Sequence, residues 1–302
     1  MSATIPIVSI GRRAAEDVTR ARRADVVGVF ASSFHLETDA GRLVCIGHPR
    51  IGNGPVNALA VWDDDLATCA ALGLHVGQVA AIGNDEIALA GGPVFRLDAA
   101  KVWMWPAWPV MTSRQAQADL CDEVTAYVRD TAPAEGLARV LLGEEPRERL
   151  AQVLFRTAQA HVATLRGWCD GLGGRDRASD AQAEVAARGL VGLGPGLTPS
   201  GDDFLCGMLV ALRAVGETKA AEDLGFWISR APADATTRLS RAFLAAARDG
   251  EPTEGLYAAV AGVLAADARL LGHGLELLAA TGHSSGWDML AGALAVLARR
   301  EW

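Results

Sequence analysis

The chain has 302 residues, a formal net charge of −8 and 50% hydrophobic residues, a composition typical of a folded globular protein. A chain of this length can hold two domains, each with its own core. The acidic balance argues against broad nucleic-acid binding, because that function requires a basic face. No apolar run approaches the ~20 residues that a membrane-spanning helix needs, so we expect no membrane segment.

The five cysteines are widely scattered and form no C-x-x-C pair, so the sequence predicts neither a zinc site nor a redox pair. Their odd number indicates buried thiols in a reducing compartment. The first residues are rich in arginine and poor in apolar side chains, unlike a secretory signal. Together these features predict a cytoplasmic protein.

The first third of the chain reads as β structure. Residues 1–24 are expected to be an irregular lead-in, and from residue 25 short apolar runs alternate with turns rich in Gly, Pro and Asn. Short strands at this spacing predict a small barrel or sandwich. Asn53, in the tight turn 52–55, is a candidate ligand-binding residue. The expected strands are 26–30, 43–46, 57–62, 79–82, 86–89 and 94–97.

From residue 113 onward nearly all of the sequence predicts helix. Apolar residues recur at spacings of three and four, and Ala and Leu dominate. The fold class is therefore expected to be α+β, with a β-rich domain over residues 1–110 and a mainly α-helical domain over 111–302. The expected helices are 114–129, 147–168, 178–188, 204–215, 220–229, 236–248, 253–271 and 285–299.

One glycine-rich stretch stands between two helical patterns, the sequence GLGPGLTPSGDD at 192–203. Gly and Pro exclude a helix interior, so it predicts a loop that ends at a helix N-terminus, where unpaired amides can bind an anion. No Lys follows the glycines and Pro195 interrupts the spacing, which excludes the Walker loop and the dinucleotide fingerprint. A capping box of Ser200 and Asp203 is the purely structural interpretation, but it leaves Thr198 and Asp202 unexplained.

A second stretch repeats part of the first. The pattern Ser-Gly-x-Asp at 200–203 recurs at 285–288, and Gly292 takes the place of Gly207. An interior helix glycine costs about 1 kcal/mol relative to Ala, so two equivalent ones predict close approach of the two backbones. Both helix N-termini would then face one cavity. Chance similarity of two capped helices is the alternative.

Asp202 and His283 are the candidate catalytic residues. The capping box does not need Asp202, which could bind a metal or a substrate NH₂ group, and His283 on its loop could act as a general acid or be merely solvated. One Asp pair is too little to assign a Mg²⁺ site, so no metal ligands are predicted and Mg²⁺ stays open as a cofactor. The other candidate residues lie in loops and at helix starts: Gly194, Gly196, Thr198, Ser200, Gly201, Asp203, Thr236, Thr237, Ser240, Ser284, Ser285 and Asp288.

The motifs at 192–207, 236–240 and 282–292 resemble those of the oxamate carbamoyltransferase subunit family (AllH-like), long catalogued as a domain of unknown function. The resemblance to the first third is looser and rests on the β-rich stretch and the Gly-x-Gly-Pro element at 52–55. It implies a part in anaerobic allantoin breakdown, where carbamoyl phosphate and oxamate give phosphate and oxalurate. It also implies two partners, an acyl-CoA-synthetase-like subunit and a third subunit, and it assigns no catalytic residue.

Two other functions stay open at this point. The chain could be a non-catalytic scaffold or regulatory subunit, in which the motifs only build helix ends. It could also be a stand-alone phosphotransferase that uses Asp202 with Mg²⁺. The carbamoyltransferase and the phosphotransferase would both act on a small anionic substrate, and for both we expect anion binding at helix N-termini.

Overall fold

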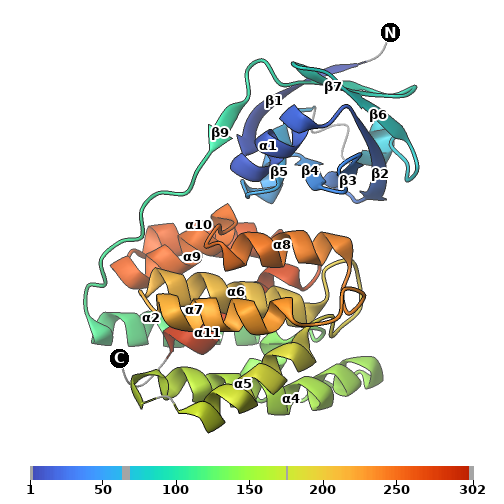
Figure 1. The fold of residues 1–302 in the computed structure, drawn as a ribbon. Helices are drawn as coiled ribbons and strands as arrows, with labels where there is room; N and C mark the ends of the chain where they lie inside the picture. The colour runs from blue at the N-terminus through green and yellow to red at the C-terminus, as the bar shows by residue number, and fades with distance from the viewer. Residues whose placement is uncertain (1–2, 63–68, 175, 299–302) are drawn as a thin grey trace. The chain divides into compact units, whose positions relative to one another are not determined.

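The computed structural model describes residues 3–62, 69–174 and 176–298. The chain splits into two compact units, Met1–Pro106 and Ala107–Trp302, each with its own hydrophobic core. The first unit is a β-barrel with one α-helix, and the described part of the second is helical (Figure 1). The predicted α+β class, with a β-rich part before a helical part, is confirmed.

The barrel closes through β5, which pairs with β4 on one side and with β1 on the other. In the described residues eight strands close in the order β5-β4-β3-β2-β6-β7-β8-β1, and β9 pairs with the second half of β1. The strands are β1 (Thr4–Gly11), β2 (Arg23–Val29), β3 (Ser33–Thr38), β4 (Leu43–Gly47), β5 (Asn57–Ala60), β6 (Val79–Ile82), β7 (Glu86–Leu89), β8 (Val94–Arg96) and β9 (Lys101–Trp103).

The expectation of an irregular lead-in over residues 1–24 is wrong. The chain enters the barrel at once through β1 and continues into helix α1 (Arg12–Arg20). Along β1, Thr4 and Pro6 are exposed whereas Ile5 and Ile7 are buried. This alternation is typical of a half-buried strand. The alternation is visible in the sequence, but the neighbouring arginines obscure it.

The helical unit contains ten α-helices within its described residues, two more than predicted. Short α3 was not expected, and the predicted helix 253–271 is two helices. The chain turns at Ala266, a left-handed residue with φ of 54°, and Asp267 then caps α10. The helices are α2 (Arg114–Thr131), α3 (Ala138–Leu142), α4 (Arg149–Asp170), α5 (Arg177–Leu190), α6 (Ser200–Ala214), α7 (Thr218–Ser229), α8 (Arg238–Arg248), α9 (Glu254–Ala265), α10 (Ala268–Ala279) and α11 (Ser285–Leu297).

Helix α6 occupies the centre of the helical unit and contacts α5, α7, α8, α9 and α11. All its residues from Ser200 to Leu212 are buried, and α11 is buried from Gly286 to Leu297. An α-helix that is buried on all sides reads as uniformly apolar, which explains why α6 follows its polar start with the run FLCGMLVAL. The two motif helices therefore form the middle of the core. None of the helices in the described part of the chain is long and apolar enough to cross a membrane.

Candidate functional site

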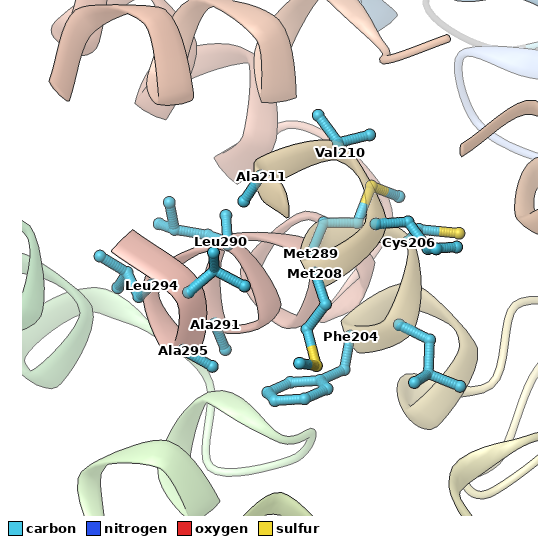
Figure 2. Packing of buried hydrophobic residues seen from close by; sticks show 14 of the residues in the cluster. Phe204, Cys206, Met208, Val210, Ala211, Met289, Leu290, Ala291, Leu294 and Ala295 are labelled. Carbon is cyan, nitrogen blue, oxygen red and sulfur yellow. The ribbon is translucent and has the colours of Figure 1, made fainter. Parts of the chain in front are cut away.

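The two motif helices, α6 and α11, touch backbone to backbone. A Cβ atom on Gly207 would lie 1.9 Å from the carbonyl oxygen of Met289, and a Cβ atom on Gly292 would lie 1.9 Å from that of Phe204. Any side chain at either position would collide with the partner helix, so glycine is required at both. Figure 2 shows how the larger side chains of both helices pack around this contact. The predicted close approach at these two glycines is confirmed.

The contacts between α6 and α11 are reciprocal, because each involves matching positions of the repeated motif. Ser285 lies against Asp203, and Ser200 lies against Asp288. Ser200 and Ser285 are the first residues of their helices, so the two helices start side by side and run in the same direction. The hydroxyl oxygens of Thr198 and Ser285 are 2.8 Å apart. The prediction that the two loops lie close together is therefore confirmed.

The glycine within each Ser-Gly-x-Asp pattern also lies against the backbone of a neighbouring helix. A Cβ atom on Gly201 would lie 2.0 Å from the carbonyl oxygen of Leu190, the last residue of α5. A Cβ atom on Gly286 would lie 1.9 Å from the carbonyl oxygen of Leu278 in α10. Each motif thus fixes the start of its helix against the helix that precedes it.

Asp202 anchors the glycine-rich loop to the start of α8. Its Oδ1 accepts a hydrogen bond from the amide of Gly192 at 2.9 Å, and its Oδ2 accepts from the hydroxyls of Ser240, at 2.7 Å, and Thr236. The side chain is fully buried. Both carboxylate oxygens are thus engaged with this chain, and the binding of a metal or a substrate NH₂ group by Asp202 stays a prediction.

The start of α8 also contacts the loop. Thr237 is the N-cap residue of α8, because its hydroxyl accepts a hydrogen bond from the amide of Ser240, and it donates to the carbonyl of Leu197. Pro195, Gly196 and Leu197 are exposed, whereas Thr198 is half-buried. The loop therefore presents its tip to solvent and its hydroxyl to the interior.

The predicted capping box of Ser200 and Asp203 does not form. The N-cap residue of α6 is Pro199, which has no side chain able to accept, and Ser200 is already inside the helix. The amides of Gly201 and Asp202 are taken by the carbonyls of Leu193 and Pro199, at 2.8 and 2.9 Å. The start of α6 therefore offers fewer open amides to an anion than the sequence implied.

Asp203 is a buried acid with a raised pKa. Burial raises the pKa of Asp203 well above its usual value, and the charge of Asp288 adds to the rise. The hydroxyls of Ser285 and Thr198 act in the opposite direction because they stabilise the ionised form. The Oδ2 atom of Asp203 has no hydrogen-bond partner among the described residues.

Asp288 reaches from α11 to the turn before α3. Its Oδ1 accepts from the amide of Leu137 at 2.5 Å, and Gly136 leaves room for the carboxylate. Burial raises the pKa of Asp288 to about 7, although this amide and the hydroxyls of Ser200 and Ser284 favour the ionised form. Its Oδ2, like that of Asp203, has no partner among the described residues. The contribution of residues 136 and 137 had no signal in the sequence.

Two further predicted residues, His283 and Asn53, have other surroundings. The side chain of His283 is 76% exposed and its Nε2 lies 3.2 Å from a carboxylate oxygen of Glu135. Asn53 belongs to the barrel unit, where its Oδ1 accepts a hydrogen bond from Ser9. Within the helical unit the structure thus brings together most of the predicted residues, whereas His283 lies at the surface.

The part of the chain that the structure describes holds no group of three or more His, Cys, Asp or Glu side chains arranged to bind a metal ion. Both oxygens of Asp202 accept hydrogen bonds from this chain, whereas Asp203 and Asp288 each keep one oxygen without a partner among the described residues.

Residues 190–297 match the family model described as oxamate carbamoyltransferase subunit AllH. The family resemblance predicted from the motifs is confirmed over this segment. The AllH segment begins at the end of α5 and includes the whole of α6 and α11, so both motifs and the start of α8 lie within it. The searches of curated proteins and of solved structures gave no match.

The AllH segment does not include every residue that contacts the buried carboxylates. Leu137, which donates to Asp288, lies before it. The described residues outside the segment therefore help to build the site, although the family model does not extend to them.

Proposed function

We propose that this chain is a subunit of an oxamate carbamoyltransferase, which joins carbamoyl phosphate and oxamate to give oxalurate and phosphate. One observation carries the proposal: the two motifs inside the AllH segment meet at one place in the fold. Their matched serines, Ser200 and Ser285, are 85 positions apart in the sequence. A scaffold needs helix ends, but it does not need half-buried hydroxyls next to unpartnered carboxylates.

Oxamate and carbamoyl phosphate each carry an anionic end and an NH₂ group, and the site offers hydroxyls and carboxylates that could receive them. Both substrates are small anions that also carry an NH₂ group. We propose that the partly exposed loop with Gly194, Gly196 and Thr198, together with Thr236 and Thr237 at the start of α8, receives the anionic end. The carboxylates of Asp203 and Asp288 would lie beneath the hydroxyls, on the side where N–H groups are favoured. Binding, orientation and stabilisation of the leaving phosphate are the demands of this reaction, and it needs no protein nucleophile.

The partners are part of the proposal. The family's printed name describes a subunit, and we propose that an acyl-CoA-synthetase-like subunit and a third subunit complete the enzyme in the cytoplasm. His283, which stands exposed before α11, remains our candidate for a general acid that acts once the partners are in place.

Thr198→Val tests this function, because valine has nearly the same shape and lacks the hydroxyl. The assembled complex carrying this variant is expected to lose at least ~10-fold in kcat/KM for phosphate release with oxamate, equivalent to ~1.4 kcal/mol of transition-state stabilisation. Thr157→Val is the matched control, since its hydroxyl only returns to the carbonyl of Val153 on α4.

The result also separates the enzyme from a non-catalytic subunit. The complete engagement of Asp202 and the tight α6–α11 contact favour that second function, because both are structural. Wild-type turnover in a normally melting Thr198→Val complex would support the scaffold and count against a ligand site at this loop.

A further inference from the structure

Two oxygen atoms at the α6–α11 contact, Oδ2 of Asp203 and Oδ2 of Asp288, have no donor within the described residues. The two side chains are 1% and 0% exposed. A buried carboxylate oxygen without a donor is costly, and two uncompensated negative charges at one place cost more. A proton between them would supply a donor and remove one of the two charges.

The reciprocal contacts place these two carboxylates near each other, since the charge of Asp288 acts on Asp203. Each is the fourth residue of its helix, and each lies against the first residue of the other helix. The electrostatic effect of Asp288 on Asp203 agrees with this placement.

Within the described residues no ion pair offsets the two negative charges. Among the described residues neither Asp203 nor Asp288 takes part in an ion pair, and the neighbouring ionisable groups of α6 are Asp202 and Cys206. On the α3 and α11 side, Arg139 of α3 pairs with Glu144, and Glu135 and His283 lie against each other at the surface. The local electrostatics are acidic, so full ionisation of both carboxylates is unfavourable.

We infer that Asp203 and Asp288 hold one proton between them, and that the hydroxyls of Thr198 and Ser285 connect this pair to the exposed glycine-rich loop. One shared proton gives each unpartnered oxygen a hydrogen bond and leaves a single negative charge. The link is short, because the two hydroxyl oxygens are 2.8 Å apart and both hydroxyls lie against Asp203.

The pair has a use in the reaction, and this part rests on the proposed function. When the amide nitrogen of oxamate attacks the carbamoyl carbon, a C–N bond forms and the C–O bond to phosphate breaks, with its electron pair leaving on the phosphate. One N–H proton must then leave the nitrogen. The hydroxyls of Thr198 and Ser285 pass it to the carboxyl pair, which changes from one proton to two and afterwards returns one to the leaving phosphate. Asp203 and Asp288 act here as positioning residues, since they do not touch the substrate.

The shared proton is tested by melting curves of the full chain between pH 5 and pH 8. A carboxyl group whose pKa is raised on folding contributes stability at low pH, and this is lost as pH rises toward the folded value, about 7 for Asp288. In Asp203→Asn or Asp288→Asn the amide replaces the shared proton as donor, so the fall in Tm with pH should shrink by about half or more. Asp202→Asn is the matched control, equally buried on the same helix, and should keep the wild-type slope.

A measurement on the wild-type chain keeps the proposal falsifiable if neither variant folds. A protonated carboxyl group has its own infrared band that shifts in D₂O, and it should persist at pH 7.5 in wild type. Absence of that band, or an identical pH slope in wild type and in a folded Asp203→Asn chain, overturns the shared proton.

The connection to the loop is tested on the assembled complex. The pH profile of kcat for oxamate carbamoylation should shift in Asp203→Asn by about one unit or more, while KM for oxamate changes less. An unshifted profile in an active complex rejects the relay. A complex that transfers no carbamoyl group to oxamate rejects the proposed function, and the melting and infrared results still decide the shared proton.

Discussion

Gly207 of α6 lies against the carbonyl oxygen of Met289 in α11 so closely that a Cβ atom would stand 1.9 Å away. The repeat of the motif makes the same contact a second time with the roles of the helices exchanged, at Gly292 and Phe204. Close packing of this kind transmits any change in one helix start to the other, since interiors are dense and cannot absorb an added methyl group. The position of Ser285 against Asp203 thus depends on a contact one turn further along each helix.

Replacement of Gly207 by Ala should therefore destabilise the helical unit. The added methyl group would force α6 and α11 apart, and the expected loss is about 2 kcal/mol or more in the free energy of unfolding. Gly167→Ala in α4 is the control, because a Cβ atom there meets nothing within 4 Å. It should be neutral or stabilising by up to about 1 kcal/mol. Urea unfolding of both variants measures the difference, and equal stabilities would disprove the close contact.

Asp202→Ala should loosen the loop without involving a ligand. It removes the acceptor for the amide of Gly192 and for the hydroxyls of Ser240 and Thr236. Loss of these hydrogen bonds to a buried carboxylate predicts about 2–4 kcal/mol of destabilisation. Asp234→Ala on the exposed segment nearby serves as the control. A stable Asp202→Ala protein with lowered activity would instead restore the catalytic role that the sequence suggested.

Thr237→Ala should cost about 1 kcal/mol or slightly more, because it removes the N-cap of α8 together with the bond to Leu197. Thr237→Ser keeps the hydroxyl and should retain most of the stability. Ser200→Ala should show no capping loss, since Ser200 lies inside α6. Thermal unfolding of the three variants separates these expectations, and a clear loss in Ser200→Ala that Ser200→Thr rescues would show that its contact with Asp288 matters instead.

His283→Gln tests the exposed histidine. Its ion pair with Glu135 is exposed on both sides, and such pairs contribute little, so Tm should stay within about 1–2 °C of wild type. Activity of the assembled complex should fall by about 10-fold or more if His283 acts as a general acid. Unchanged activity would mean that the exposed His–Glu pair is only a surface feature.

The close contact between the two motifs could be predicted from the sequence because the signal lies within the motifs themselves. Gly207 and Gly292 are conspicuous inside apolar helices, and only close contact explains why a helix would tolerate them at the same place twice. The β-rich first part and the helical second part were also predictable, since hydrophobic periodicity changes from two to between three and four residues.

The individual roles were not predictable, for reasons that lie in the tertiary structure. Asp202 and Asp203 are adjacent in sequence, but one faces the start of α8 and the other faces α11. The amide of Leu137 donates a hydrogen bond to Asp288, 151 positions away in the sequence, and no sequence pattern near either residue predicts this hydrogen bond. The break at Ala266 was missed because alanine rarely adopts a left-handed conformation, so the sequence there looks like continuous helix.

The burial of α6 on all sides also has a consequence for how the chain acquires its structure. The helix that covers Gly207 begins at Ser285, 71 positions after α6 ends at Ala214. During synthesis, α6 leaves the ribosome with its apolar surface uncovered. Helices α7 to α10 are synthesised before α11, which covers Gly207. Contacts between such distant segments form late and leave the nascent chain prone to aggregation. We therefore expect a chain truncated before Ser285 to aggregate on expression rather than to persist as a smaller folded protein.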